Sequence, residues 1–427
     1  MRRSDLFLPT SRERRGEGTT ATTLLRRAGL IREFGSGLWG LTPAGTRVSQ
    51  KITKRIHDGM HAVGGQEVEL PGLQQRDRWE QSGRWGAFEG EMFTFEDRDG
   101  RELCLAPSHE EGVVHMLDGL VRSYEELPLV LYQVDAKFRD DHARGGLLRC
   151  KEFTMKDAYS VHTDEDSLRE TYEEIREAYC RILDDLGVRF AVCAVEDSVM
   201  GGDRSEEFVA PVRDGTCDLL YCTADGCRFG LSDEADRFEA LGDGDACPDC
   251  GGSLRESGGV EVGHVFELGT RYSAAMGFTV DDADGQPREV EMGSYGLGVG
   301  RILQTLVMQG AEGRDGDDGC RWPVTEWGCV APYRAAIIPI GDGEVQRVAE
   351  RIHDDLGRDG LLYDGDHSVG ERFAESALLG VPTKIIVGND YRETGEGDIE
   401  YRNGESEQVA IEDAADVVAR FGAGGAQ

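Results

Sequence analysis

The chain has 427 residues, 39% of them hydrophobic, which is enough for two or three globular domains with packed cores. Its 82 Asp and Glu outnumber its 47 Lys and Arg and give a formal net charge of −35, which argues against general affinity for polyanions because nucleic-acid binding depends on neutralising phosphates. A salt-rich cytoplasm would reconcile such a surface with a nucleic-acid partner, because the Debye length falls to about 3 Å near 1 M salt, so we expect a salt-loving source.

No run of 18 apolar residues occurs in the sequence, and residues 1–18 combine arginines with no long apolar core. We therefore predict neither a membrane span nor a secretory signal, and expect a cytoplasmic protein. The eleven cysteines are then expected to be reduced thiols, available as metal ligands, and not a disulfide framework.

The first strong helical pattern carries apolar residues at positions 48, 52, 56 and 60, and a strand is predicted at QEVELP, residues 66–71. Farther along, LAPSHEE places Ser108 and Glu110 in a loop just after a strand. A hydroxyl and a carboxylate there suit recognition of a substrate amine. The alternative is a helix N-cap in which Ser108 caps and Glu111 closes a capping box.

Cationic side chains gather at residues 138–159 of this otherwise acidic chain. They are Arg139, Arg144, Arg149, Lys151 and Lys156. Apolar runs at 129–132 and 147–148 flank the glycine pair 145–146, which predicts an antiparallel hairpin with a mobile loop and arginines on both arms. Such guanidinium groups suit phosphate or carboxylate binding, and Phe153 offers a ring for a base. A solvated hairpin with scattered charge is the alternative.

The order of residues in this hairpin resembles motif 2 of the class II aminoacyl-tRNA synthetases: FRDD at 138–141, a loop, and Arg149 four residues before Phe153. The continuation EFTMKDAYSVH is similar to the prolyl-tRNA synthetase version. This resemblance implies that Arg139 binds the α-phosphate and the amino-acid carboxylate, that Arg149 binds the outer phosphates, and that Phe153 stacks on adenine. Asp141 stands where the family has Glu.

The same resemblance assigns further roles. Residues 66–71 are similar to motif 1, a dimer-interface element, so a homodimer is implied. The implied proline pocket consists of Ser108, Glu110, Arg139, Met155, Asp157, Tyr159, His264 and Ser294. Ser108 replaces the family's Thr and Ser294 its commoner Cys, while Glu206 stands at the His of the family's G-G-S-x-S-H-E-F pattern.

A glycine-dense passage, EMGSYGLGVGR at residues 291–301, precedes a predicted helix over 302–308 and allows a ligand to approach the backbone closely. It resembles class II motif 3, which implies that Arg301 binds the γ-phosphate. The implied catalytic residues are therefore Arg139, Arg149 and Arg301, joined by Phe153 and Glu261 at the ATP site. Glu289 and Glu291 are candidate Mg²⁺ ligands.

Two cysteine pairs, Cys222 with Cys227 and Cys247 with Cys250, have the spacing of a four-thiolate zinc ribbon. We predict structural Zn²⁺, with an unmetallated relic as the alternative. A catalytic zinc is not expected, because four thiolates leave no open coordination position.

From residue 335 onward, strands and helices alternate, which predicts an α/β domain of about a hundred residues. It is similar to the class IIa anticodon-binding domain. Residues 330–427 nevertheless carry 9 Arg and Lys against 20 Asp and Glu, and the family's basic D-x-R-x-x-R-P-G stretch reads DGDHSVG at 364–370. The arginines that the resemblance implies for anticodon reading are absent.

The predicted fold is an α+β class II synthetase catalytic domain, with an antiparallel sheet and flanking helices, a zinc-ribbon-like insertion and a C-terminal α/β anticodon-binding domain. The expected boundaries are 1–215 and 258–327 for the catalytic domain, 216–257 for the insertion and 328–427 for the last domain. Residues 197–258 leave no room for the large editing insertion that bacterial-type relatives commonly carry.

The resemblance implies activation of L-proline with ATP and Mg²⁺ and its transfer to tRNA(Pro). Two alternatives are a paralogue that passes an activated amino acid to another acceptor, supported by the depleted anticodon stretch, and a non-catalytic tRNA- or protein-binding paralogue.

Overall fold

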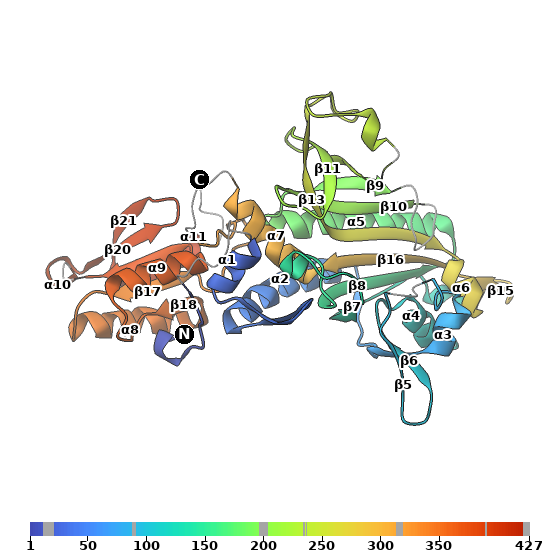
Figure 1. Ribbon diagram of the computed structural model, residues 1–427, viewed down its shortest axis with the longest axis horizontal. Coiled ribbons are helices and arrows are strands. Elements are labelled where there is room, and N and C mark those ends of the chain that lie inside the picture. Colours follow the sequence, from blue (N-terminus) through green and yellow to red (C-terminus); the bar gives the residue numbers. More distant parts are fainter. Residues whose placement is uncertain are drawn as a thin grey trace.

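The computed structural model describes residues 1–11, 21–87, 91–195, 204–233, 235, 237–312, 319–388 and 391–421. These residues form an elongated molecule, in which a C-terminal domain occupies one end and a larger domain built on a long sheet occupies the rest (Figure 1). Among the described helices, none combines the length and the apolar character needed to cross a bilayer.

The larger domain is organised around a nine-stranded sheet with the order β10-β9-β12-β11-β13-β16-β8-β7-β3. Most neighbours are antiparallel, while β3–β7 and β9–β12 are parallel. The strands are β3 (Gln66–Glu67), β7 (Leu129–Phe138), β8 (Glu152–His162), β9 (Ala191–Val195), β10 (Arg204–Val212), β11 (Cys217–Cys222), β12 (Phe229–Ser232), β13 (Leu254–Gly269) and β16 (Glu291–Gly298). The predicted antiparallel sheet is confirmed, although β3 is shorter than the strand expected over residues 66–71.

Helices α5 (Glu165–Leu186) and α7 (Val299–Ala311) pack on one face of the sheet, and α2 (Pro43–Ala62) packs against both. α2 begins where the hydroxyl of Thr42 accepts a hydrogen bond from the backbone N–H of Gly45, with Pro43 in the first turn. The predicted apolar face of α2 is fully buried, at Val48, Ile52, Ile56 and Met60. These helices leave the opposite face of β7, β8, β13 and β16 available for a site.

A smaller layer covers part of that opposite face. α4 (Glu110–Leu117) and α6 (Arg271–Met276) pack there, with Val113 and Tyr272 in one apolar cluster with Tyr159 and Val161. Around them lie α3 (Arg76–Gln81), β4 (Leu73–Gln75), β5 (Thr94–Glu96), β6 (Glu102–Leu105), β14 (Thr279–Asp281) and β15 (Pro287–Glu289). The N-terminal helix α1 (Ala21–Arg27) is followed by the hairpin of β1 (Ile31–Gly35) and β2 (Leu38–Leu41).

β7 and β8 form the predicted antiparallel hairpin, in register from Leu129↔Val161 to Phe138↔Glu152. One detail of the prediction is wrong: Leu147 and Leu148 do not begin the return strand but lie in a short 3₁₀ helix and are buried. The reason is tertiary, because the backbone N–H of Leu147 donates to Gln304 Oε1 of α7 at 2.8 Å. Arg139 and Arg149 consequently lie in the connecting loop, beyond the strand ends.

The segment with the paired cysteines extends the central sheet. β11 and β12 pair with each other, and β11 also pairs with the first part of β13, from Cys217↔Gly259 to Cys222↔Leu254. In Figure 1 these strands stand above α5. The motif GGDRSEEF is only partly visible in the structure, because positions 201–203 lie outside the described residues.

The C-terminal domain has a five-stranded sheet with the order β18-β17-β19-β20-β21. Its strands are β17 (Ala335–Pro339), β18 (Gly360–Leu362), β19 (Thr383–Val387), β20 (Glu396–Tyr401) and β21 (Ser406–Ala410), and its helices are α8 (Glu344–Leu356), α9 (Val369–Leu379), α10 (Tyr391–Thr394) and α11 (Ala414–Phe421). The predicted α/β pattern is confirmed. The chain's N-terminus also packs here, since the N-terminal amine of Met1 donates to the carbonyl of Gly360 at 2.6 Å.

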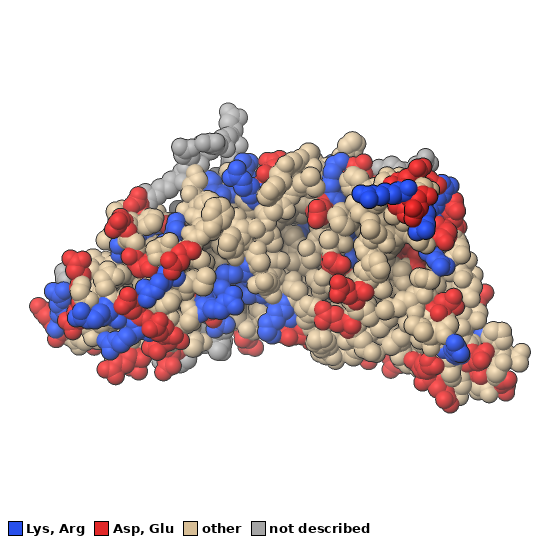
Figure 2. Space-filling view, turned by 90° about the horizontal axis from the view of Figure 1, so that it is seen from below, with Lys and Arg blue, Asp and Glu red and all other residues tan. Residues whose placement is uncertain are grey.

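Positive charge is unevenly distributed. Figure 2 shows acidic side chains toward both ends of one face, with Lys and Arg mixed among them, and a further group of Lys and Arg nearer the middle. At the seam between the two domains, Arg47, Lys51 and Arg334 surround the carboxylate of Asp359 at 3.6–3.9 Å. Part of the scarce positive charge therefore joins the two domains.

Candidate active site

A cavity of about 430 Å³ lies on the face of the sheet opposite α5. It gathers every residue that the resemblance assigned to ATP or proline: Ser108, Glu110, Arg139, Arg149, Phe153, Met155, Asp157, Tyr159, Glu261, His264, Ser294 and Arg301. Met155, Asp157 and Tyr159 alternate along β8 as predicted, so their side chains share one face. The candidate Mg²⁺ ligands Glu289 and Glu291 do not line the cavity.

One end of the cavity is rich in guanidinium groups. Arg301 Nη1 lies 2.7 Å from Glu261 Oε2, and Arg149 Nη1 lies 3.2 Å from Asp141 Oδ2. Burial opposes ionisation of Glu261, but the contacts with Arg301 and His264 together outweigh it and hold the pKa of this carboxyl below its usual range. Burial, assisted by the charge of Arg301, lowers the pKa of Arg139. The lining here includes three arginines and the carboxylates of Glu91, Asp141 and Glu261. The guanidinium donors suit an anion.

Arg139 lies beside Phe153, and its guanidinium carbon is 5.5 Å from the centre of the ring. Its nitrogen atoms donate weakly to the carbonyl of Pro107, at 3.3 and 3.4 Å. The long contacts leave donor capacity available for a stronger acceptor such as a phosphate or a carboxylate.

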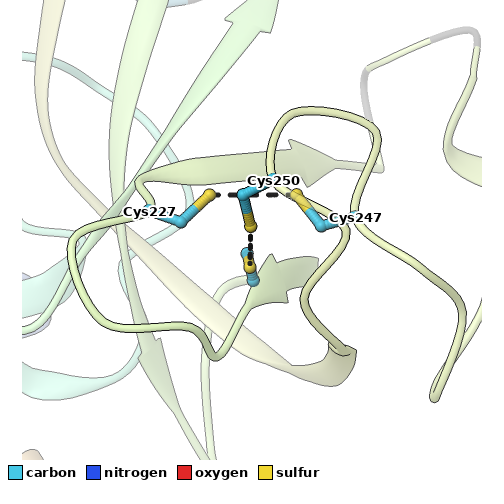
Figure 3. Close-up of side chains that lie close together, drawn as sticks. Cys227, Cys247 and Cys250 are labelled. Carbon is cyan, nitrogen blue, oxygen red and sulfur yellow. Dashed lines mark hydrogen bonds between the residues drawn. The ribbon is translucent and has the colours of Figure 1, made fainter.

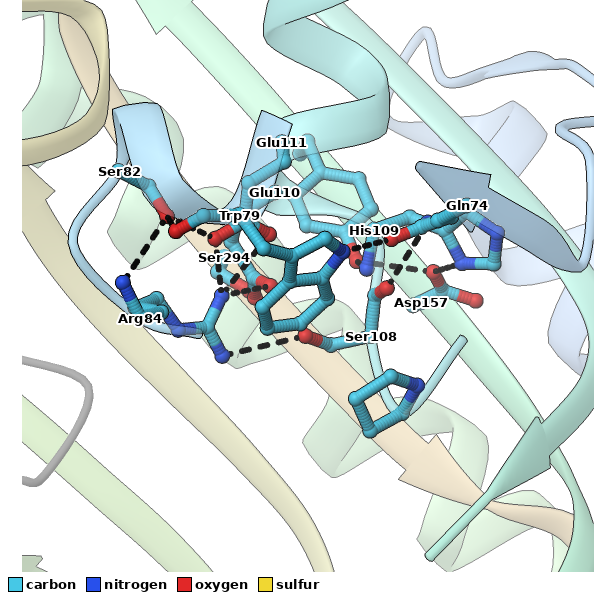
Figure 4. Close-up of polar contacts among 12 residues, drawn as sticks. Gln74, Trp79, Ser82, Arg84, Ser108, His109, Glu110, Glu111, Asp157 and Ser294 are labelled. Carbon is cyan, nitrogen blue, oxygen red and sulfur yellow. Dashed lines mark hydrogen bonds and ion pairs between the residues drawn. The ribbon is translucent and has the colours of Figure 1, made fainter. Parts of the chain in front are cut away.

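The other end of the cavity holds a buried cluster of charged side chains (Figure 4). Arg84 Nη1 lies 3.0 Å from Glu110 Oε2 and 3.1 Å from Glu111 Oε2, and Arg84 Nη2 donates to Ser108 Oγ at 3.2 Å. Ser294 Oγ donates to the other oxygen of Glu110 at 3.0 Å. One guanidinium thus contacts both carboxyl groups, and the carboxylate of Glu110, which lines the cavity, can accept a hydrogen bond from an ammonium group.

The two carboxyl groups of this cluster differ. Burial raises the pKa of Glu111, whereas at Glu110 burial is outweighed by the charge of Arg84 and hydrogen bonds from Ser108, Arg84 and the backbone together, so the pKa is lowered. Glu110 is therefore the carboxylate that stays ionised beside the cavity. The capping-box alternative is wrong, because His109 is the N-cap of α4 and Glu111 instead accepts hydrogen bonds from Ser82 and Arg84.

A second buried network supports the floor of the cavity through Asp157. Lys137 Nζ lies 2.8 Å from Asp157 Oδ1, while Tyr159 and Gln133 donate to Asp157 Oδ2 at 2.9 and 3.0 Å. Burial opposes the charge, yet contacts with His109 and Lys137 hold the pKa of Asp157 at about 2. This carboxylate is thus fixed and ionised.

Several of these supporting residues were not assigned to the site from the sequence, namely Arg84, His109, Glu111, Gln133 and Lys137. A signal existed for Gln133, because β7 and β8 pair in the predicted hairpin and Gln133 lies opposite Asp157. No comparable signal connects Arg84 to Glu110, because their contact depends on how α3 and α4 pack.

Glu207, Glu261 and His264 form a further group whose ligand atoms all lie within 4.8 Å of one another. His264 Nδ1 is 3.2 Å from Glu261 Oε1 and 3.7 Å from Glu207 Oε1. The Nε2 atom of His264 is buried with no hydrogen-bond partner. Carboxylate oxygens beside the arginine-rich end fit the preference of Mg²⁺ for oxygen ligands.

The four predicted cysteines converge at the far end of β11 and β13 (Figure 3). All four sulfur atoms lie within 4.8 Å of one another; Cys222 and Cys250 are 3.5 Å apart, and Cys227 and Cys247 are 3.8 Å apart. A tetrahedron of sulfurs with metal–sulfur bonds of about 2.3 Å has edges of about 3.8 Å. The observed spacing therefore matches a four-thiolate metal site.

Comparisons with known proteins agree with this geometry. Residues 93–309 match the tRNA synthetase class II core domain (G, H, P, S and T), and residues 334–420 match the anticodon binding domain. The chain is 35% identical to the proline--tRNA ligase of Acidiphilium cryptum, over 97% of this chain and 99% of the relative. It is 38% identical to the probable mitochondrial proline--tRNA ligase of Rattus norvegicus, over 85% of this chain and 76% of the relative.

A solved structure shares the fold. It is the prolyl-tRNA synthetase from Cryptosporidium parvum complexed with halofuginone and AMPPNP, with a TM-score of 0.73 and 17% identity, covering 94% of this chain and 74% of that one. The sheet order, the motif residues around one cavity and the full-length similarity converge. The chain belongs to the proline--tRNA ligase family of the class II aminoacyl-tRNA synthetases.

Proposed function

We propose that this chain is a proline--tRNA ligase, which activates L-proline with ATP and passes the prolyl group to tRNA(Pro). The observation that carries the proposal is the polarity of one cavity. A buried carboxylate, Glu110, lies at one end, and Arg139, Arg149 and Arg301 lie toward the other. Proline supplies a secondary ammonium group and a carboxylate, and ATP supplies a triphosphate. These groups match the order of charges along the cavity.

In the first step, a carboxylate oxygen of proline attacks the α-phosphorus of ATP, prolyl-adenylate forms and pyrophosphate leaves. Glu110 holds the ammonium group, Arg139 lies between the carboxylate and the α-phosphate, and Arg149 and Arg301 contact the outer phosphates. Phe153 stacks on the adenine. Positioning and charge neutralisation suffice, so no protein nucleophile is required.

The remaining pocket residues shape the proline subsite. We assign Ser108, Met155, Tyr159, His264 and Ser294 to contacts with proline, with Asp157 as the fixed carboxylate beneath them. Glu261 and Glu207 would hold Mg²⁺, which neutralises phosphate charge when bound. In the second step, a hydroxyl of the terminal ribose of the tRNA attacks the activated carbonyl and AMP leaves.

The match to an anticodon binding domain over residues 334–420 favours a tRNA acceptor over another acceptor molecule. The complete set of arginines in the cavity favours catalysis over a binding-only role. The unusual feature is the acidic stretch at residues 364–370, which predicts that the anticodon is read without the family's arginines.

Pyrophosphate exchange and tRNA charging test this function. The purified protein should exchange labelled pyrophosphate into ATP only when proline is present, and should charge tRNA(Pro) in preference to other tRNAs. Exchange that depends on threonine or histidine would refute the amino-acid assignment. Proline-dependent exchange without any charging would favour the paralogue that serves another acceptor.

We also propose three finer properties. The four cysteines hold structural Zn²⁺, supported by the spacing of their sulfurs. The chain forms a homodimer through the region of β3, supported by the position of β3 at the edge of the central sheet. The enzyme functions in the cytoplasm, where translation uses its product, in a salt-loving organism, consistent with the net charge of −35.

A further inference from the structure

Two hollows lie between the ATP end of the active-site cavity and the N-terminal helix. The first, of about 390 Å³, has five lining residues in common with the active-site cavity, Phe153 and Gly300 among them, and the β1–β2 hairpin supplies half of the others. The second, of about 820 Å³, shares Phe34 and Leu41 with the first and reaches α1. We call these two hollows together the hairpin groove.

The β1–β2 hairpin is a fixed wall of this groove. Its turn rests on the loop between β7 and β8, where the backbone N–H of Lys151 donates to the carbonyl of Gly37 at 2.9 Å. Gly37 has a φ of +73°, and a Cβ atom there would lie 2.7 Å from the Cβ of Ala143. The contact therefore requires glycine, and it couples the hairpin to the loop that carries Arg139 and Arg149.

The groove exposes aromatic and aliphatic side chains to an unusual degree. Nine large hydrophobic residues are exposed among the described residues, and four of them line it: Phe7, Phe34, Leu38 and Leu41. Phe34 is the most exposed of the nine, at 77%. Its ring lies over the backbone of Gly40, because a Cβ at Gly40 would meet it at 2.5 Å. One ring face is thus supported, and the side chain as a whole stays open to solvent.

Cations accompany these rings. Among the described residues, three arginines and one acidic residue line the second hollow: Arg26, Arg27, Arg32 and Glu33. This local excess of positive charge contrasts with the overall charge of −35. Open aromatic rings interleaved with guanidinium groups characterise surfaces that bind single-stranded nucleic acid, because bases stack on the rings and arginines contact phosphates.

We propose that the hairpin groove binds the single-stranded 3′ end of the tRNA and leads it into the active site. This inference rests on the proposed function, since it concerns how the acceptor reaches the adenylate. Phe34 stacks on a base of the overhang, and Arg32 contacts its phosphates. The groove borders the cavity at Phe153, which lines both.

The test compares a groove variant with a matched surface variant. Phe34→Ala combined with Arg32→Glu removes one exposed ring and reverses one charge in the groove. Phe95→Ala combined with Arg98→Glu makes the same changes near the β5–β6 hairpin, where both residues are exposed and neither lines the groove. Each protein is assayed for proline-dependent pyrophosphate exchange, for charging of tRNA(Pro) and for binding of an acceptor-stem minihelix.

We expect the groove variant to keep the exchange activity, because proline and ATP do not contact these residues, and to raise the KM for tRNA at least tenfold. Its affinity should fall for a minihelix with the 3′ overhang and not for the same duplex lacking the overhang. The surface variant should behave as the wild type. The retained exchange activity also shows that the groove variant is folded.

Several outcomes would overturn the inference. An unchanged KM for tRNA, or an equal loss of affinity for overhanging and blunt duplexes, would exclude the groove as the overhang site. A changed mass in light scattering without a change in minihelix binding would assign the groove to a second copy of this chain. If the wild-type protein shows no proline-dependent exchange, the proposed function itself is refuted.

Discussion

Arg84 Nη1 lies 3.0 Å from Glu110 Oε2, and both side chains are almost completely buried. The guanidinium also stacks near the rings of Trp79 and Tyr272, at 4.8 and 5.2 Å from their centres. Arg84 does not line the cavity. It is therefore a positioning residue, which keeps Glu110 ionised and aimed at the substrate amine.

Replacing Arg84 with Met should destabilise the protein by about 3–5 kcal/mol, because two buried carboxylates lose their shared counter-charge. Chemical denaturation measures this loss. In protein that remains folded, the KM for proline should rise far more than the KM for ATP, because the amine end is disturbed and the arginine end is not. Arg84→Lys should recover part of the stability and part of the affinity for proline, since lysine restores the positive charge without the planar guanidinium group. Equal effects on the two KM values would indicate a purely structural role.

Arg139→Ala should lower the rate of proline-dependent pyrophosphate exchange by about 10²–10³-fold, because a charge-assisted contact to the developing phosphate charge is lost. Arg139→Lys should recover little, since an ammonium group cannot make two parallel hydrogen bonds. Arg144→Ala is a suitable control, because Arg144 lies in the same loop and does not line the cavity. Exchange kinetics with saturating proline and ATP decide the matter. A variant Arg139→Ala with normal exchange would remove this residue from the reaction.

The motif residues and their common cavity could be predicted from the sequence, because short-range spacing defines them and β8 alternates in a regular way. The supporting residues could not, because their partners come from other elements: Arg84 precedes Glu110 by 26 positions, and the two meet only through the packing of α3 against α4. The strand predicted to begin at Leu147 and Leu148 was wrong for the same reason. An apolar pair after two glycines is typical of a strand, and its burial against α7 has no local signature.

Stability should fall as the pH drops below about 6.5, because His162 is buried. Burial lowers the pKa of His162 to about 4, so the unfolded chain takes up a proton at a pH where the folded protein does not. Because the pKa of His162 is lower in the folded state, its contribution to the free energy of unfolding is complete above the pKa of the unfolded chain. That contribution decreases as the pH falls toward 4. By pH 5 the loss should be about 2 kcal/mol. Denaturant titrations at pH 7 and pH 5 measure it.

The matched variant for this test is His162→Gln, which keeps a hydrogen-bonding group near Ser167, the present partner of His162 Nδ1 at 2.9 Å. The difference between pH 7 and pH 5 should shrink by about 2 kcal/mol in this variant. An identical pH dependence in both proteins would show that other groups dominate in this range.

The cysteine cluster should bind about one zinc ion per chain, as measured by elemental analysis, because its four sulfurs already have the spacing of a tetrahedral site. Cys247→Ser should abolish the metal and reduce amide-exchange protection in β11 and the first part of β13. Cys217→Ser is the control, since Cys217 lies on β11 outside the cluster. Proline-dependent exchange should change less than in Arg139→Ala, because the cluster does not line the cavity. Metal-free wild-type protein with normal stability would contradict the prediction.

The last prediction concerns alanine, which is smaller than proline and fits the same pocket. Missing methylene groups discriminate by only about 1–3 kcal/mol each, so some alanyl-adenylate and alanyl-tRNA should form. The family resemblance implied that bacterial-type members commonly carry a large editing insertion, whereas the described residues between β9 and β13 form β10, β11, β12 and the cysteine cluster. We therefore expect the purified protein to accumulate alanyl-tRNA when proline is absent. Deacylation of preformed alanyl-tRNA by this chain should not exceed the rate in buffer, and hydrolysis well above that rate would show that the cysteine region or the active site itself removes the wrong amino acid.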